Sequence, residues 1–346
     1  MERELSYTAA VHEATESEMS RDESVIVMGL GVDDYLGIYG TTKGLAEKFG
    51  PERCFDTPLA EDGMTGVAIG AALAGLRPIH VHIRMDFLVL AVNQLVNFAA
   101  KARYMYGGQV HVPMVVRAVI GRSWGQGAQH SQALYSWFMH TPGLKVFAPS
   151  TPYDAKGTMI AAIRDDNPVV MIEHRHLHAG KGHVPAESYT VPFGKARVLA
   201  AGTDVTLVGV SYMALEALRA HEYLREAGIS AEVIDPVCLA PLDIDTIVES
   251  VNRTGRLVVA DNAWTTCGAA SEIITQVLER VERPVKFRRI GFAPVVCPTT
   301  RKLEDRFYPT SVTVATAAYD LVRPSGARWA PEQKPAVERV TFKGPF

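Results

Sequence analysis

The chain has 346 residues, 47% of them hydrophobic, and a formal net charge of −3. That length favours about two ordinary domains whose cores need no disulfide or metal. The mild charge, with no block of lysine and arginine, argues against nucleic acid or anionic lipid as a partner. The four cysteines lack C-x-x-C spacing, which argues against a zinc site and is typical of reduced cytoplasmic thiols.

The N-terminal region is rich in glutamate and predicts an amphipathic helix rather than a signal or transit peptide. The most apolar stretch, residues 87–100, is shorter than the roughly 20 residues of a membrane span. It also contains amide side chains, so a buried helix is expected there. We therefore predict a cytoplasmic protein without a membrane segment.

Short apolar runs alternate with longer helical patterns. In the first half the strand-like runs are 23–31, 53–59, 77–83, 112–120, 144–150 and 168–174. This alternation predicts a mostly parallel sheet with helices on both faces. A polar stretch at 174–191, rich in His, Gly and Pro, is predicted to be a surface linker, after which the alternation resumes. The sequence thus predicts an α/β fold of two domains, 1–185 and 186–346, with an extended C-terminal tail.

The stretch GRSWGQGAQHS, residues 121–131, contains the pattern G-x-S-x-G of a hydrolase nucleophile elbow. That elbow requires a strand, a sharp turn and a helix that starts at the serine. Ser123 is instead followed by a flexible GQGAQ loop. We therefore favour a coincidence of spacing over a hydrolase.

Four histidines, His174, His176, His178 and His183, follow the last strand-like run of the first half. Alternate residues of a strand share one face, as metal ligands must. No cysteine or carboxylate stands nearby at ligand spacing, and the region reads as a linker. We favour a solvated histidine-rich loop over a metal site.

Glu61 follows a strand-like run and precedes a helix with glycines at 63, 66 and 70, which permit close packing against another backbone. The carboxyl end of a parallel strand is where α/β proteins bind ligands. A glutamate beside a helix N-terminus is, however, more often a simple dipole partner. Neither G-x-G-x-x-G after a strand nor a P-loop motif occurs, so dinucleotide and nucleotide triphosphate sites have little support.

The chain contains the long consecutive stretches TKGLAEKFGPERCFDTPLAEDGMTGVAIGAALAGLRPI and GAQHSQALYSWFMHTPGLKVFAPSTPYDAKG. These stretches resemble the beta subunits of thiamine-diphosphate-dependent 2-oxo acid dehydrogenases, the pyruvate, branched-chain and acetoin enzymes of the transketolase-like superfamily. The resemblance implies that 1–185 is a pyrimidine-binding domain with a parallel sheet. It further implies that 186–346 is a transketolase C-terminal-like α/β domain.

The resemblance also implies roles for single residues. Glu61 matches the glutamate that hydrogen-bonds the pyrimidine ring nitrogen and promotes the imino tautomer, the base that deprotonates the thiazolium carbon. Phe87 matches the phenylalanine that stacks on the pyrimidine, and Leu59 would line the same pocket. His130 matches the active-site histidine that faces the substrate, with Gln129 beside it as a further cofactor contact.

Metals and partners are implied in the same way. In some members a potassium ion is held largely by backbone carbonyls, which map to Met114, Ala162, Ile163, Asp165 and Asn167. Magnesium and the diphosphate are held mainly by a G-D-G motif of an alpha subunit, and this chain has no GDG. The resemblance therefore implies an α2β2 heterotetramer with shared sites.

The implied function is oxidoreductase activity: decarboxylation of a small 2-oxo acid and transfer of the acyl unit to a lipoyl transacylase core. The stretches GRSWGQG, DPVCLAPLD and GFAPVVCPTTRKLEDRFYP depart from the usual pattern and leave docking to that core open. One alternative is a split carboligase or transketolase-type enzyme that passes a two-carbon unit to an aldehyde or ketone. Another is a non-catalytic scaffolding subunit, against which the presence of Glu61, Phe87 and His130 argues.

Overall fold

The computed structural model describes residues 3–121, 125–325 and 328–334. Contacts divide the chain into two compact units: Met1–Ile120 with Trp137–Phe193, and Gly121–Ser136 with Gly194–Phe346. The chain passes from one unit to the other after Ile120, Ser136 and Phe193. Gly121–Ser136, a segment from the first half of the sequence, packs with the second unit, and the boundary expected at residue 185 stays a prediction.

The first unit contains a parallel sheet. Its strands run in the order β6 (Lys145–Phe147), β7 (Val169–His174), β5 (Val115–Ile120), β4 (Arg77–His82), β2 (Val25–Gly29) and β3 (Cys54–Asp56). Every residue of β2, β5 and β7 is buried. Burial on both faces explains why these strands read as continuous apolar runs rather than as alternating patterns.

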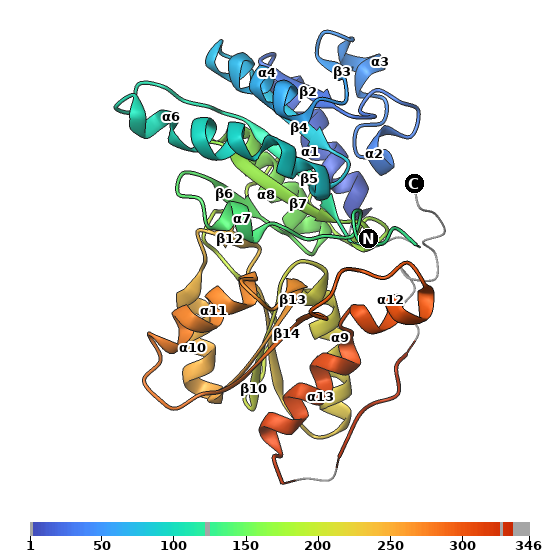
Figure 1. Ribbon diagram of the computed structural model, residues 1–346, viewed down its shortest axis with the longest axis vertical. Coiled ribbons are helices and arrows are strands. Elements are labelled where there is room, and N and C mark those ends of the chain that lie inside the picture. Colours follow the sequence, from blue (N-terminus) through green and yellow to red (C-terminus); the bar gives the residue numbers. More distant parts are fainter. Residues whose placement is uncertain (1–2, 122–124, 326–327, 335–346) are drawn as a thin grey trace. The chain divides into compact units, whose positions relative to one another are not determined.

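Helices cover both faces of this sheet (Figure 1). On one face α1 (Tyr7–Arg21) packs against α8 (Pro152–Arg164). Each begins at a hydroxyl cap: the side chain of Ser6 accepts from the N–H of Ala9, and that of Thr151 from the N–H of Asp154. The other face carries α4 (Glu61–Leu73) and α5 (Met85–Leu88).

The apolar stretch after α5 is not one buried α-helix. It comprises a 3₁₀ turn, Val89–Ala91, a π-helix, Gln94–Ala99, and α6, Ala100–Met105. Leu95 and Ala99 are buried, whereas Leu90 is exposed, so the run lies half in the core. None of the helices in the described residues is both long enough and apolar enough to cross a membrane.

The predicted surface linker at 174–191 is wrong for its first part. His174, His176 and His178 are buried, because β7 is an inner strand and the N-terminal segment covers its end. The N–H of Thr8 donates to the carbonyl of His178, and β8 (Lys181–His183) pairs antiparallel with β1 (Glu4–Ser6). Among the described residues no group of three His, Cys, Asp or Glu side chains could hold a metal ion.

The second unit has a five-stranded sheet. Its order is β14 (Lys286–Phe292), β13 (Arg256–Trp264), β10 (Val205–Gly209), β11 (Ala231–Asp235) and β9 (Arg197–Ala200), parallel except for β9. One face is covered by α9 (Tyr212–Glu226) and α13 (Ser311–Val322), the other by α10 (Ile244–Thr254) and α11 (Ala269–Leu278) (Figure 1). The predicted tail packs on its own unit where it is described, since Trp329 stacks on Tyr319.

Six short elements complete the fold among the described residues. They are α2 (Gly37–Gly40), α3 (Leu45–Phe49), α7 (Ser136–Met139), a 3₁₀ turn (Arg175–Leu177), β12 (Cys238–Ala240) and α12 (Arg301–Phe307).

Candidate functional site

Two of the predicted cofactor residues follow strands of the first unit's sheet, at its carboxyl edge. Glu61 follows β3 and Phe87 follows β4, and β2 lies between these two strands. Because the strands are parallel, their carboxyl ends lie on one edge, where α/β sheets bind ligands. Helix α4, which Glu61 begins, packs against the 3₁₀ turn that follows Phe87 and Leu88. The fold therefore brings both residues to the same side of one unit.

Glu61 is the first residue of α4, and Asp62 is the second. Both carboxylates lie in the first turn, where the helix dipole favours negative charge. The residue before them, Ala60, offers no side-chain cap. Within the described part of the chain, no hydrogen bond or ion pair engages the Glu61 carboxylate. The carboxylate is therefore available to a ligand.

Apolar side chains accompany this carboxylate. Leu59 is 80% exposed in the turn between β3 and α4. Phe87 is half-buried, while Met85, Asp86 and Leu88 around it are buried. A free carboxylate with an accessible leucine and a partly open phenylalanine suits a flat aromatic heterocycle that carries a ring nitrogen.

The glycines of α4 do not pack against another backbone of this chain. A Cβ added at Gly63 or Gly70 would meet nothing within 4 Å, and one at Gly66 would meet only the Gln94 side chain at 3.8 Å. Val67 and Leu73, on the same helix, are also exposed. The close packing expected of these glycines is thus absent within the described residues, and the bare face points away from the core.

His130 and Gln129 lie in the second unit, not with Glu61. The segment Gly121–Ser136 makes its contacts there, although it follows β5 of the first unit in sequence. His130 is half-buried and Gln129 is exposed. Ser123, the serine of the elbow-like pattern, falls outside the described residues.

The predicted potassium residues lie at the opposite, amino-terminal edge of the first sheet. Met114 precedes β5, and residues 162–167 form the end of α8 and the start of the turn that leads to β7. The main-chain oxygens of Ile163 and Asp165 both accept from Arg77 Nη1, at 3.0 and 3.1 Å. Two further main-chain oxygens of this set also accept hydrogen bonds. The N–H of Val169 donates to the oxygen of Met114, and the N–H of Asp165 donates to that of Ala162.

These contacts bear on whether the loop fits a cation. Each of the four main-chain oxygens already accepts an N–H, and the Asp165 carboxylate pairs with the Lys145 ammonium. None of these four oxygens lacks a partner, and the side chains of Arg77 and Lys145 bring positive charge to this loop. The potassium ion therefore stays a prediction without support from this geometry.

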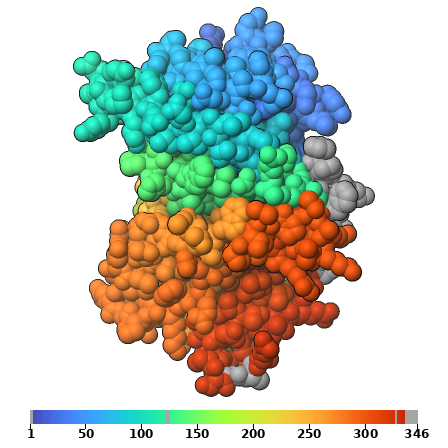
Figure 2. Space-filling model, viewed as in Figure 1, coloured from blue at the N-terminus to red at the C-terminus, as the bar shows by residue number. Residues whose placement is uncertain are grey.

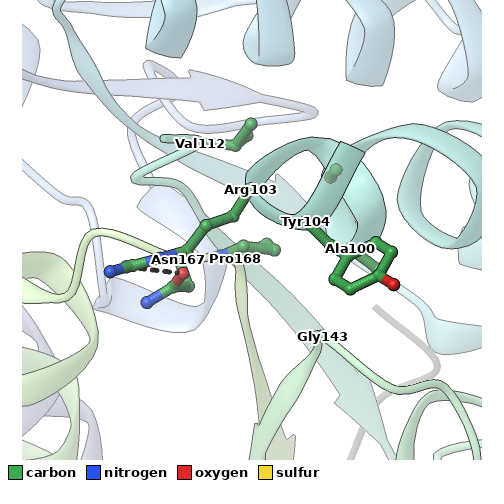
Figure 3. A pocket seen from close by; sticks show the side chains of 8 residues that line it. Ala100, Arg103, Tyr104, Val112, Gly143, Asn167 and Pro168 are labelled. Carbon is green, nitrogen blue, oxygen red and sulfur yellow. Dashed lines mark hydrogen bonds between the residues drawn. The ribbon is translucent and has the colours of Figure 1, made fainter. Parts of the chain in front are cut away.

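A cavity of about 290 Å³ lies beside this loop (Figure 3). Arg103, Tyr104 and Asn167 are among the residues that line the cavity. The Arg103 guanidinium donates to Asn167 Oδ1 at 3.2 Å. Asn167 is the one predicted site residue among its lining residues. The cavity thus belongs to the amino-terminal edge of the sheet, away from the edge that carries Glu61 and Phe87.

Comparison with known proteins agrees with this geometry. Residues 3–180 match the family described as "Transketolase, pyrimidine binding domain", and residues 194–314 match "Transketolase, C-terminal domain". Over 334 residues the chain is 43% identical to the acetoin:2,6-dichlorophenolindophenol oxidoreductase subunit beta of Cupriavidus necator, covering 92% of this chain and 97% of that one. The chain belongs to this family of beta subunits.

Other members of the beta-subunit family are similarly close. The chain is 42% identical over 324 residues to the pyruvate dehydrogenase E1 component subunit beta-1, mitochondrial, of Arabidopsis thaliana, covering 91% and 89% of the two chains. A solved structure titled "Split gene transketolase, inactive beta4 tetramer" is 24% identical, with a TM-score of 0.77 over 92% of this chain and 98% of that one. That likeness concerns the fold alone. The predicted α/β fold and the predicted family of thiamine-diphosphate-dependent oxidoreductases are confirmed.

Sequence reasoning missed a buried polar network in this beta subunit. Arg117 and Glu173 are fully buried and form an ion pair, with Arg117 Nε to Glu173 Oε1 at 2.6 Å, and Arg117 Nη2 donates to Thr41 Oγ1 at 2.8 Å. On β4, His80 and His82 are buried as well. The signal was present, since a charged residue inside an apolar parallel-strand run requires a buried partner.

Proposed function

We propose that this chain is the beta subunit of a thiamine-diphosphate-dependent dehydrogenase that cleaves a small 2-oxo acid or the related hydroxyketone acetoin and passes on the acyl unit. The observation that carries the proposal is the unengaged Glu61 carboxylate at the carboxyl edge of a pyrimidine-binding domain. Relatives named for acetoin and for pyruvate support the substrate class.

The residues divide the work by chemistry. Thiamine diphosphate, when bound, supplies the acidic carbon that attacks the substrate carbonyl. Glu61 would share a proton with the pyrimidine ring nitrogen, a role that needs a carboxyl group with no competing partner. Phe87 and Leu59 would cover the ring and keep water from it. His130 would move a proton at the substrate, with Gln129 beside it as a cofactor contact.

A partner subunit completes the proposal. The bare glycine face of α4, with Val67 and Leu73, offers close approach to a second backbone. The surface view shows atoms of this part of the chain, coloured light blue, exposed on the viewed face (Figure 2). We propose that an alpha subunit packs here in an α2β2 assembly and holds magnesium and the diphosphate. The lipoyl transacylase core, the potassium ion and the cytoplasmic location stay predictions.

The first experiment replaces Glu61 by Gln in the chain co-expressed with its alpha partner. Gln keeps the shape but cannot share a proton, so turnover should fall by roughly 10² or more. Asp62→Asn is the matched control, because it removes a neighbouring first-turn carboxylate with the same dipole contribution. Turnover is measured with dichlorophenolindophenol as electron acceptor. Near-normal turnover of the Glu61→Gln complex would contradict the proposal.

A second measurement identifies the substrate and the acceptor. Acetoin and pyruvate are supplied separately to the same complex, first with the dye and then with a lipoyl domain. Reduction and acylation of the lipoyl domain support the dehydrogenase. Formation of acyloins from added aldehydes, without lipoyl acylation, would instead favour the split carboligase.

A further inference from the structure

Two contacts with the second unit flank His130 in the described part of the segment that carries it. The first is at Gly127, whose φ of +65° requires glycine and whose added Cβ would lie 2.6 Å from Thr299 Cγ2. The nearby Gly125 also has a positive φ and faces the carbonyl of Thr299. A side chain at Gly127 would collide with Thr299. The backbone at Gly127 therefore packs directly against residues 297–299.

Two unusual parts of the sequence therefore meet in space. The loop GRSWGQG and the stretch GFAPVVCPTTRKLEDRFYP both depart from the pattern that the chain otherwise resembles. Cys297 and Thr299 of the second stretch lie against Gly127 of the first. The buried Cys297 thiol also lies 3.4 Å from the Tyr308 hydroxyl, so the segment that contacts Gly127 is tied to a later part of the same stretch.

The second contact is at Tyr135. Its ring is fully buried, and its hydroxyl donates to Asp261 Oδ1. The other carboxylate oxygen of Asp261 accepts from the N–H of Ala270 at 3.0 Å, at the start of α11. Asp261 lies within the buried run of β13, residues 257–263, and is itself fully buried. A rigid strand and a helix N-terminus thus hold the phenol in one place.

His130 lies between these two contacts, three residues after Gly127 and five before Tyr135. Because this segment is short and is held at both Gly127 and Tyr135, the backbone at His130 has little conformational freedom. Burial raises the pKa of the Tyr135 phenol, with the Asp261 carboxylate adding to the effect, so the phenol remains a donor at neutral pH.

We propose that Asp261, acting through the Tyr135 hydroxyl, is a positioning residue that fixes the loop 127–135 and so sets His130 for its role in the reaction. The effect on turnover rests on the function proposed above for His130, whereas the effect on the loop does not. A buried hydroxyl–carboxylate contact between residues 126 positions apart is a long-range constraint that the local sequence of the loop cannot supply.

The loop itself is tested first, in the beta chain without its partner. Hydrogen exchange of peptides covering 125–136 should rise at least severalfold in Tyr135→Phe, which loses one hydroxyl, and in Asp261→Asn. Tyr212→Phe is the control, because it removes another buried tyrosine–carboxylate bond of the same unit, to Glu216 Oε1 at 2.8 Å. Unchanged exchange in Tyr135→Phe would overturn the proposal.

The reaction is tested next, in the assembled complex. Tyr135→Phe should lower kcat by roughly tenfold, change KM little, and alter the pH profile, because a misplaced catalytic group loses rate rather than binding. The double variant with Asp261→Asn should be no worse than the more impaired single variant, since both remove one contact. A loosened loop with unchanged kcat and pH profile would overturn the positioning role. Full activity of His130→Gln would instead overturn the function proposed for His130 and leave the exchange result standing.

Discussion

Arg117 and Glu173 show how a single pair of residues can dominate the interior of the first unit. Both are fully buried on neighbouring inner strands, and His178 Nε2 lies 3.5 Å from Glu173 Oε2. Burial by itself would raise the pKa of Glu173, but the Arg117 charge and the His178 contact lower it to about 2. Removing one partner of a buried ion pair leaves an uncompensated charge in the core. It therefore lowers the free energy of unfolding far more than the loss of a surface ion pair does.

Glu173→Gln should therefore destabilise the beta chain by about 3–5 kcal/mol, because the Arg117 guanidinium loses its counter-charge in the core. The measurement is urea unfolding at pH 7. Glu222→Gln serves as control, since Glu222 pairs with Arg225 on the exposed face of α9 and should leave the unfolding midpoint unchanged. A Glu173→Gln variant as stable as this control would contradict the buried ion pair.

Helix α4 shows at the scale of an element how a sequence pattern can predict packing that the described residues of this chain do not supply. Thr65, Ala68, Ile69 and Ala72 form the buried stripe, and the glycines occupy the opposite side. The small-residue pattern indicated close helix packing, but in the described chain only the Gln94 side chain comes near these glycines. An apolar helix with a bare face is expected to be covered by another chain.

Substitutions at Gly70 should affect the stability of the beta chain and its assembly with the alpha subunit differently. Gly70 has ordinary helical backbone and open space around it, so Gly70→Ala should stabilise the isolated chain by up to about 1 kcal/mol. Gly70→Leu should leave the chain folded but prevent close approach of the alpha subunit. Co-purification and sedimentation measure the assembly, with Thr275→Leu on the exposed side of α11 as the control for added bulk. Normal assembly of Gly70→Leu would exclude this face as the contact.

At the scale of the whole molecule, several buried groups make global stability depend on pH. Burial lowers the pKa of His80 to about 4, although its Nδ1 faces the carbonyl of Met28 at 3.4 Å, and burial lowers the pKa of His82 further. Below the ordinary histidine pKa of about 6.5 the unfolded chain takes up these protons and the folded chain does not. Stability is therefore lost as pH falls from 6.5 toward 4, and Glu173 adds a further loss between its ordinary pKa and about 2.

The free energy of unfolding should accordingly fall steadily between about pH 6.5 and pH 4. Each such histidine contributes a slope of up to about 1.4 kcal/mol per pH unit in that window. His80→Asn keeps a donor for the Met28 carbonyl but cannot titrate, so it should flatten the slope. Urea unfolding at half-unit pH steps measures this, and a slope unchanged by His80→Asn would contradict the assignment.

Much of the fold and part of the site were predictable from the sequence. Alternating apolar runs and helical patterns are set by local periodicity, so the α/β class and most strands of both units could be expected. Glu61 and Phe87 could be located because each follows a strand, and parallel strands end on a common edge. The buried histidines after β7 were not predictable, because polarity along the chain does not reveal what the N-terminal segment will cover.

Local pattern and long motifs thus established the strand–helix alternation, the family and the candidate residues of this beta subunit. Tertiary structure decided that His130 belongs to the second unit and that Arg117 and Glu173 neutralise each other. It also decided that no hydrogen bond or ion pair from the described residues engages the Glu61 carboxylate. The reason is the range of the interactions. Periodicity acts over a few residues, whereas the Tyr135–Asp261 contact and the buried ion pair join residues that only the folded chain brings within bonding distance.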